Sequence, residues 1–311
     1  MIAAVDIGGT KIATGLVNDL GAVLVAADMP VNCDCGPRDA TRRILNALRT
    51  QIQATGIPLK GIGIGCTGPV DPGTGELGEV NTLRGWRGWN PVQELAEAFH
   101  VQVAIENDAD AAALGEMRWG AGKGKRSVVY IIVGTGIGAG IVLNGEIYRG
   151  AHDSHPELGH HIVEPLGPAC TCGATGCWES LASGPALERW FARQQPTTEM
   201  LTAKEICSRA RTGDVRAIIA VDRLGKYLGM GIANVISMLM PERIVLGGSV
   251  MQSADLFLDR IRATVQDKCR LVPAARCDVA LASLGNSAGL IGAAQVWHHR
   301  FRSPVSQAEV L

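Results

Sequence analysis

The sequence shows no excess of charge of either sign and no long hydrophobic run. Its 311 residues include 29 Lys and Arg and 30 Asp and Glu, which gives a formal net charge of −1. A basic excess of the kind that attracts nucleic acid or acidic membranes is therefore missing. No apolar run reaches the roughly 18 residues that a membrane-spanning helix needs. We therefore expect a cytoplasmic protein that binds neither nucleic acid nor membrane.

The cysteines do not suggest a disulfide framework. There are nine, an odd number, and no secretory signal is recognisable. Six of them belong to no second cluster of ligand side chains, and we expect these to be reduced and mostly packing residues. They are Cys33, Cys35, Cys66, Cys207, Cys269 and Cys277.

What the chain does contain is apolar material and glycine. It is 47% hydrophobic, and its length is enough for two domains of ordinary size. The 39 glycines cluster in short turns, where the backbone can approach a ligand closely.

A dense group of metal-binding side chains lies between Glu157 and Glu179. The group consists of His160, Cys170, Cys172 and Cys177. Three thiolates and one imidazole form a complete tetrahedral set for zinc and leave no open position, so we expect a structural site. The two flanking carboxylates are not needed as ligands, which predicts that the metal holds a loop for another purpose. Four unrelated residues of a surface loop are the alternative, but cysteines this dense are usually ligands or catalytic groups.

The chain opens with a predicted antiparallel meander of strands at residues 2–7, 12–17 and 22–27. Asp6 and the run Gly8-Gly9-Thr10-Lys11 occupy the first turn. Glycine turns expose backbone N–H groups to an anion, and the adjacent carboxylate can hold a hydrated Mg²⁺. A plain hairpin would explain the two glycines but not their polar neighbours. The spacing before the lysine excludes a Walker A loop.

The same pattern recurs in the second half of the chain. Residues 127–133 are a predicted strand, residues 134–140 (Gly134-Thr135-Gly136-Ile137-Gly138-Ala139-Gly140) a glycine turn, and residues 141–143 a second strand. Asn144-Gly145 is a strong hairpin signal before a third strand at 146–148. This recurrence predicts two topologically related lobes, each with a phosphate-binding turn.

Polar residues follow the predicted strand at 101–105. Glu106, Asn107, Asp108 and Asp110 stand where this strand ends and a helix begins, which is where α/β folds place ligands. One of them could be only the helix N-cap, but a cap does not require several polar residues. Gly247-Gly248-Ser249 ends another predicted strand, at 243–246, and can face a nucleotide.

The remaining elements follow from apolar periodicity and turn residues. Helices are predicted at 39–54, 91–100, 180–194, 203–212, 215–240, 255–268 and 288–299, and further strands at 61–66 and 277–282. Residues 121–126 are interpreted as a hinge, and the tail from Arg302 as loose.

These motifs together resemble the ROK family (repressor, open reading frame, kinase) of bacterial sugar kinases over almost the whole chain. The matching segments are residues 6–11, 106–109, 134–138, 157–160 and 245–248, and the three cysteines with Gly173 and Glu179. The resemblance implies an actin/hexokinase-like α/β fold of two lobes, each a ribonuclease-H-like mixed sheet with flanking helices. Residues 1–118 with a returning C-terminal helix (about 288–311) would form the small lobe. Residues 119–287, with the zinc segment 157–179, would form the large lobe.

The resemblance also implies an ATP-dependent transfer of phosphate to the 6-hydroxyl of a glucose-type sugar in a homodimer or homotetramer. Asp108 would be the general base. Sugar contacts would come from Asn81, Asn107, Asp108, Glu157, His160 and Glu179. Mg²⁺ and ATP would be held by Asp6, Gly8, Gly9, Thr10, Lys11, Gly134, Thr135, Gly136 and Gly138, with Gly247 and Gly248 near adenosine.

Other functions stay open at this stage. Repressors of the family carry an N-terminal helix-turn-helix, and the position of Asp6 near the start disfavours that reading. A non-catalytic sugar-binding protein would need neither Asp108 nor paired glycine turns. For the sugar, residues 284–289 look most like glucokinases, whereas His155-Pro156 is more like the fructokinase branch, whose cysteine spacing differs. The zinc segment also suits N-acetylmannosamine or N-acetylglucosamine kinases, so we place glucose first, these sugars second, and fructose and mannose behind.

Overall fold

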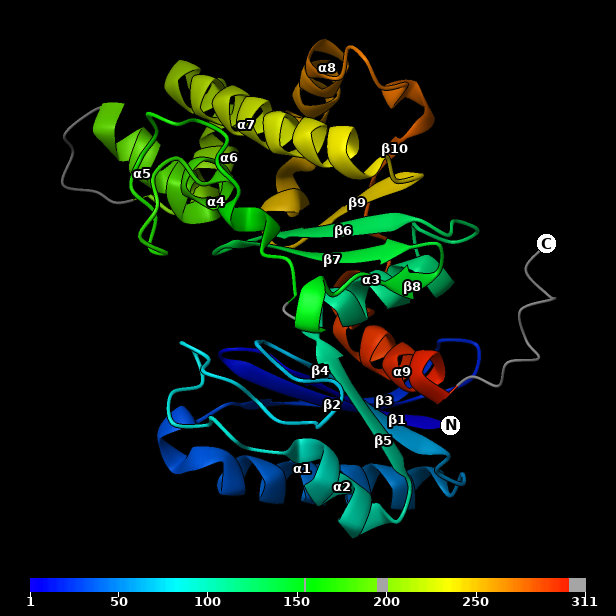
Figure 1. Ribbon diagram of the computed structural model, residues 1–311. Coiled ribbons are helices and arrows are strands. Elements are labelled where there is room, and N and C mark those ends of the chain that lie inside the picture. Colours follow the sequence, from blue (N-terminus) through cyan, green and yellow to red (C-terminus); the bar gives the residue numbers. More distant parts are fainter. Residues whose placement is uncertain (154, 195–200, 302–311) are drawn as a thin grey trace. The chain divides into compact units, whose positions relative to one another are not determined.

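The computed structural model describes residues 1–153, 155–194 and 201–301 of the chain (Figure 1). Its framework is a pair of five-stranded sheets. The strands of the first sheet are β1 (Ile2–Ile7), β2 (Lys11–Val17), β3 (Val23–Pro30), β4 (Gly61–Cys66) and β5 (Gln102–Asn107). Their order is β3-β2-β1-β4-β5, with an antiparallel meander of β1 to β3 and parallel additions of β4 and β5.

The second sheet repeats this topology. Its strands are β6 (Val128–Val133), β7 (Ile137–Leu143), β8 (Glu146–Ile147), β9 (Arg243–Gly247) and β10 (Asp278–Leu281). The order β8-β7-β6-β9-β10 is that of the first sheet, and β9 and β10 again join in parallel. The predicted recurrence of one topology in both halves of the chain is therefore confirmed.

The internal contacts divide the chain into two units. Unit 1 comprises the described residues of 1–126, 140–155 and from 282 onward, and unit 2 comprises those of 127–139 and 156–281. The lobe limits expected from the sequence, residues 1–118 and 119–287, remain a prediction.

In unit 1, both faces of the first sheet are covered by helices (Figure 1). Apolar residues of α1 (Gly36–Thr55) and α2 (Pro91–Phe99) pack with one face, and those of α9 (Ala288–Phe301) with the other. Residues of β1 alternate between the two cores, so this strand is a continuous apolar run rather than an alternating one. The part of the expected last helix and tail beyond Phe301 lies outside the described residues.

Glycines in β4 allow α9 to approach the sheet closely. A Cβ on Gly61 would lie 1.9 Å from the Trp297 ring, and one on Gly63 would lie 1.8 Å from the carbonyl oxygen of Ala293. The alternating residues of the Gly-Ile-Gly-Ile segment, Ile62 and Ile64, fill the opposite core. The alternation of Gly and Ile thus leaves the face of β4 that contacts α9 without side chains, while the other face fills the opposite core.

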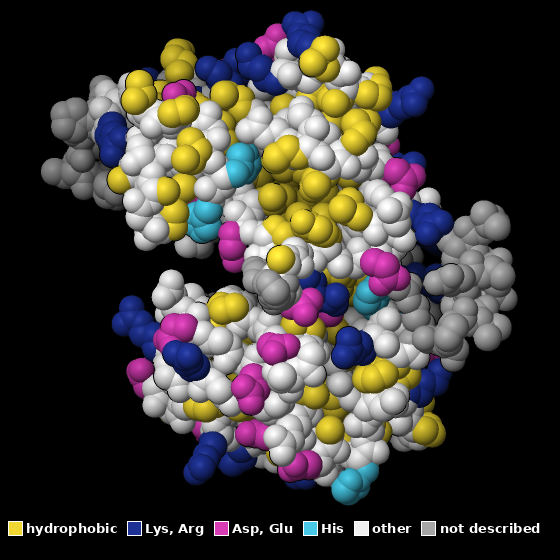
Figure 2. Space-filling view, viewed as in Figure 1, with side chains coloured by type: hydrophobic (Ala, Val, Ile, Leu, Met, Phe, Trp, Pro, Cys, Tyr) yellow, Lys and Arg dark blue, Asp and Glu magenta, His cyan; other side chains and the backbone are white. Residues whose placement is uncertain are grey.

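In unit 2, helices pack around α7 (Val215–Leu239). They are α4 (Trp178–Ala182), α5 (Gly184–Gln194), α6 (Ala203–Arg211) and α8 (Leu258–Lys268). No helix in the described ranges is both long enough and apolar enough to cross a membrane. On the face drawn in Figure 2, Lys and Arg side chains are interspersed with Asp and Glu side chains, as the balanced composition leads one to expect.

Besides the end of β3 and the start of α1, which each lie three residues outside the expected limits, three element boundaries expected from the sequence are wrong. The helix expected at 180–194 is interrupted at Ser183, which is extended, because Gly184 N–H turns to donate to the Gly134 carbonyl at 2.8 Å. The helix expected from residue 255 begins at Leu258, after a 3₁₀ segment that is non-helical at Ser253.

The third error concerns the second glycine turn, which we expected to run to Gly140. The strand β7 already begins at Ile137. A Cβ on Gly140 would lie 2.2 Å from the Ala109 carbonyl oxygen, so this glycine marks close packing on α3 (Asp108–Trp119) and not a turn.

Candidate active site and metal centre

Two carboxylates expected to act in the site lie close together in unit 1. Asp6 is near the end of β1 and Asp108 is the first residue of α3, directly after β5. The strand between them, β4, has Gly65 in register with Asp6. A Cβ on Gly65 would lie 3.8 Å from both Asp6 Oδ1 and Asp108 Cα. The carboxyl ends of three parallel strands therefore bring the two acids to one edge of the sheet.

The electrostatics of this pair favour a bound cation. Burial, and then the charge of Asp108, raise the pKa of Asp6 to about 6. Burial also raises the pKa of Asp108, although a hydrogen bond from Ala109 N–H opposes the shift. Nearby carboxylates that resist ionisation become easier to ionise when a divalent cation lies beside them. Asp6 can supply the carboxylate oxygen that Mg²⁺ prefers.

The first glycine turn and the loop with Asn81 are neighbours. Gly8 N–H donates to the Lys11 carbonyl at 2.9 Å and closes the turn. A Cβ on Gly9 would lie 2.8 Å from Thr82 Cβ, so the loop that carries Asn81 lies against the turn. The amino group of Lys11 forms an exposed ion pair with Asp28 at 3.0 Å.

Asn107 is the helix cap that we weighed against a functional role. Its Oδ1 accepts from Ala109 N–H at 2.8 Å, and Asp108 Oδ1 accepts from the same N–H at 2.9 Å. The cap thus uses one atom of the Asn107 amide. It also fixes Asp108 at the first turn of α3, where the helix dipole favours the ionised carboxylate.

Two further acids near Asp108, Glu106 and Asp110, pair with Arg149 and His155, which precede Glu157 in the sequence. The buried Glu106 pairs with Arg149, and the buried Asp110 accepts from His155 Nδ1 at 2.9 Å. Burial raises the pKa of Glu106, and the arginine opposes that shift. The sequence marked Glu106 and Asp110 as polar residues at a strand end but gave no sign of their partners. Such partners are distant in sequence and have no spacing signature.

In unit 2, Glu179 contacts the second glycine turn. Its Oε2 accepts from Ile137 N–H at 3.0 Å. A Cβ on Gly136 would lie 2.4 Å from the same oxygen, so only glycine fits there without moving the carboxylate. Gly134 accepts from Gly184 N–H at 2.8 Å and ties the turn to the start of α5.

The end of β9 lies beside this turn. Gly248 has φ +96°, and a Cβ there would lie 2.3 Å from the Val133 carbonyl oxygen. A Cβ on Gly134 would lie 3.4 Å from Ser249 Oγ. The structure therefore brings Gly134, Gly136, Glu179 and Gly248 together, whereas Gly138 is part of the strand that follows.

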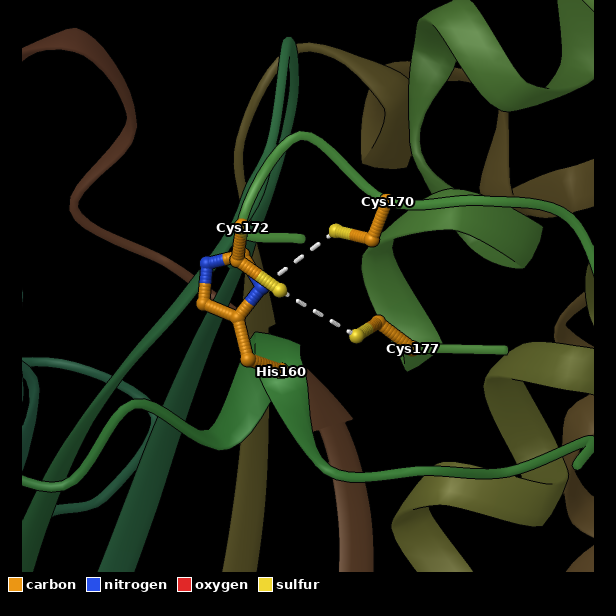
Figure 3. Close-up of side chains that lie close together, drawn as sticks. All are labelled: His160, Cys170, Cys172 and Cys177. Atoms are coloured by element: carbon orange, nitrogen blue, oxygen red, sulfur yellow. Dashed lines mark hydrogen bonds between the residues drawn. The ribbon is translucent and has the colours of Figure 1, made fainter. Parts of the chain in front are cut away.

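The four expected metal ligands converge in unit 2 (Figure 3). Their ligand atoms all lie within 4.8 Å of one another. Cys170 Sγ is 3.6 Å from His160 Nδ1, and Cys172 Sγ is 3.6 Å from Cys177 Sγ. Two thiolates on a tetrahedral zinc ion with bonds of about 2.3 Å would be roughly 3.8 Å apart. The residues therefore fit a metal ion of this kind.

The three thiols lie so close together that all of them can be deprotonated only when a cation lies between them. Burial, and then the neighbouring Cys172 and Cys170, raise the pKa of Cys177 to about 12. The pKa of the exposed Cys172 is lowered, first by a hydrogen bond from Ala174 N–H. A coordinating metal deprotonates such a thiol outright.

The loop is anchored to the rest of unit 2 by Trp178, between the last cysteine and Glu179. The indole is fully buried, and its Nε1–H donates to the Tyr227 carbonyl on α7 at 2.9 Å. A Cβ on Gly231 would lie 2.1 Å from the ring, so α7 has a glycine where the indole packs. Within the loop, Gly173 and Gly176 have φ of +94° and +77°, as the expected reversal of the chain requires.

Glu157 is exposed, and its backbone carbonyl accepts from His160 N–H at 3.0 Å. The first of the two carboxylates that flank the metal ligands thus sits one short 3₁₀ turn (Leu158–His160) before the cluster. The second, Glu179, follows the last ligand by two residues.

Comparison with known proteins identifies the family. The ROK family profile matches residues 2–300. The chain belongs to the ROK family. A ROK relative, the glucokinase of Halalkalibacterium halodurans, is 35% identical over 304 residues, which cover 93% of this chain and 92% of that protein.

Solved ROK structures agree in fold. A ROK hexokinase from Thermus thermophilus has a TM-score of 0.82 and 33% identity, covering 95% of this chain and 97% of that chain. A ROK family glucokinase from Streptomyces griseus, in complex with glucose and AMPPNP, has a TM-score of 0.77 and 32% identity, covering 95% and 98%. The family and the actin/hexokinase-like fold expected from the motifs are therefore confirmed.

Proposed function

We propose that this ROK protein is an ATP-dependent kinase that transfers the γ-phosphate to the 6-hydroxyl of glucose. The observation that carries the proposal is the pair Asp6 and Asp108, two neighbouring carboxylates with raised pKa values at the ends of parallel strands. Asp6 can bind a metal ion while Asp108 accepts a proton. The similarity to a glucokinase and to a glucokinase bound to glucose and AMPPNP supports the same assignment.

Phosphoryl transfer demands little covalent help from the protein but accurate positioning and charge compensation. In our proposal Asp108 accepts the proton of the attacking 6-hydroxyl, and burial, which raises its pKa, makes it a stronger proton acceptor than an exposed carboxylate. Asp6 holds a hydrated Mg²⁺, which would offset negative charge on the transferred phosphate. Backbone N–H groups of the two glycine turns bind the remaining phosphate oxygens.

The sugar would be bound by acceptors that suit a ring with many hydroxyl donors. We assign this role to the residues Asn81, Asn107, Asp108, Glu157, His160 and Glu179. An acceptor left unpaired by a deoxy sugar costs roughly 1–3 kcal/mol, or about 5- to 150-fold in affinity. Glucose is therefore expected to outrank its deoxy analogues clearly.

We assign zinc to the cluster of one imidazole and three thiols, because soft thiolates in a closed tetrahedral set are typical of structural zinc. Since His160 belongs both to this set and to the proposed sugar contacts, the metal would orient the sugar loop directly. The chain is proposed to form a homodimer or homotetramer, which light scattering can measure.

The test is a panel of hexoses with coupled detection of ADP, followed by NMR of the products. We expect the highest kcat/KM with glucose and phosphate at its 6-position. A far higher kcat/KM with N-acetylmannosamine or N-acetylglucosamine would refute glucose but keep the kinase. If no hexose stimulated ATP consumption, a non-catalytic sugar-binding protein would replace the proposal.

A further inference from the structure

Glu116, on α3 two turns beyond Asp108, is a buried acid to which the proposed chemistry assigns no role. Its side chain is completely buried. The carboxylate accepts hydrogen bonds from three backbone N–H groups, those of Ala121 at 2.7 Å, Ser283 at 3.0 Å and Leu284 at 3.0 Å. A buried carboxylate that is satisfied by backbone donors fixes the segments that carry those donors.

Those donors belong to two separate segments of unit 1. One segment precedes Arg126, after which the chain first leaves unit 1, and the other follows Ala282, where it enters unit 1 for the last time. Gly120 makes the first of these contacts possible, because a Cβ there would lie 2.0 Å from Glu116 Oε2. The carboxylate therefore joins two of the segments that lead out of or into unit 1 to the C-terminal part of α3.

The second segment continues into α9, and α9 reaches the proposed metal ligand. Residues 285–287 form one 3₁₀ turn before α9 begins. In the first turn of α9, a Cβ on Gly289 would lie 2.1 Å from Asp6 Oδ2. Farther along, a Cβ on Gly115 would lie 3.0 Å from Gly292 Cα, so α3 and α9 are in close contact.

We propose that Glu116 is a positioning residue that sets the start of α9 against Asp6 while α3 presents Asp108. The inference rests on the proposed function, in which Asp6 binds Mg²⁺ and Asp108 is the general base. The proposed chemistry assigns Glu116 no contact with substrate or metal. Its effect passes through residues 283–289, so a segment from the C-terminal part of the chain sets the placement of Asp6 relative to Asp108.

The test compares Glu116→Gln with a control on the same contact. Glutamine keeps the shape but presents NH₂ to backbone donors, so one segment loses its acceptor. We expect kcat to fall about 10- to 100-fold, because small misplacements of reacting groups lower the rate by such factors. The Mg²⁺ concentration at half-maximal rate should rise, while the Kd for glucose should change less than about twofold, since Asp6 is the group displaced. Ser283→Ala removes only the hydroxyl that donates to Glu116 Oε2 at 3.5 Å and keeps the backbone N–H that donates at 3.0 Å, so its kcat and Mg²⁺ dependence should stay close to those of the wild type.

A purely structural role would lower the melting temperature of Glu116→Gln and leave kcat and the Mg²⁺ curve of the folded protein unchanged, which would overturn the proposal. Gly120→Ala provides a second route, since its Cβ displaces the same carboxylate without removing it. It should reproduce the loss of kcat and the shift in Mg²⁺ dependence, and normal values of both would also overturn the proposal. Wild-type protein that formed no glucose 6-phosphate in this assay would instead refute the proposed function.

Discussion

At the scale of single residues, the site combines carboxylates with glycines that leave room for them. Asp6 faces Gly289, Glu179 faces Gly136 and Glu116 faces Gly120, each at a spacing that a Cβ would close. The sequence predicted glycine turns that approach a ligand. It could not predict these pairs, because in two of the three the partners are dozens of residues apart or more and belong to different elements.

The raised pKa of Asp6 has a consequence for stability. A carboxyl that titrates near 4 when unfolded and at about 6 when folded holds its proton more tightly in the folded state. Its contribution to stability is therefore complete below about pH 4 and is lost as the pH rises through about 6. In Mg²⁺-free protein at neutral pH, we therefore expect the ionised Asp6 to destabilise the folded state.

We predict that Asp6→Asn stabilises the Mg²⁺-free protein at pH 7.5 by up to about 3 kcal/mol and abolishes turnover. The gain should shrink steadily toward pH 4. Urea unfolding at several pH values measures it, with Asp28→Asn, on the exposed partner of Lys11, as the control. A gain for Asp6→Asn that is the same at every pH would contradict the assigned cause.

At the scale of elements, the segment 157–179, which carries the candidate metal ligands, packs on α7 through Trp178. The segment 157–179 is held to α7 by Trp178, and in our proposal a metal ion on its imidazole and thiols holds it as well. Its ligands and glycines could be predicted from spacing alone, because thiol ligands cluster locally in sequence. The anchoring of the indole on Gly231 could not, since no pattern links a loop residue to a glycine in the middle of a long helix.

Cys172→Ser should lose the metal and weaken glucose binding strongly, because the segment with Glu157 and His160 loses its anchor. Metal content by mass spectrometry and glucose affinity by calorimetry measure the two effects. Cys35→Ser, on an exposed cysteine outside the cluster, is the matched control and should retain both. Full glucose affinity in verified metal-free protein would show that metal and sugar site are independent.

Gly231→Ala tests the anchor on α7. Alanine in a helix gains at most about 1 kcal/mol over glycine in propensity. The clash with Trp178 should win, since overpacking typically costs about 1–3 kcal/mol and here the methyl would overlap a ring held by a hydrogen bond. We expect a lower free energy of unfolding by urea. A more stable variant would mean that the indole repacks freely.

At the scale of the whole molecule, the recurrence of one pattern in both halves predicted two related lobes, whereas the actin/hexokinase-like fold was expected from the family resemblance. Strand, glycine turn and strand recur in both halves, and both sheets have the topology which that recurrence predicts. What pattern reasoning missed were helix interruptions and strand starts that long-range contacts decide, as at Ser183 and Ile137. The packing of α9 on the first sheet followed only from the family resemblance, since no periodicity in residues 288–301 specifies which sheet they cover.

The candidate site was predictable to the extent that its residues form local motifs. Asp108 follows from its place at the end of a strand, and the metal ligands follow from their spacing. Arg149, Gly65 and Gly289 have no such local motif, and only the fold shows what they contact. Their partners arise from sheet register and helix docking, which a single sequence does not specify.

The most direct test of the account is glucose-dependent ADP formation by purified wild-type protein and Asp108→Asn with Mg²⁺ and ATP. Asparagine keeps the shape of the side chain but accepts no proton, and loss of a general base typically costs about 10²–10⁴-fold in rate. We predict rapid formation of glucose 6-phosphate by the wild type, and a fall of this size in kcat for the variant with nearly unchanged glucose affinity. Near-normal turnover by Asp108→Asn, or no glucose-dependent ADP from the wild type, would contradict the account.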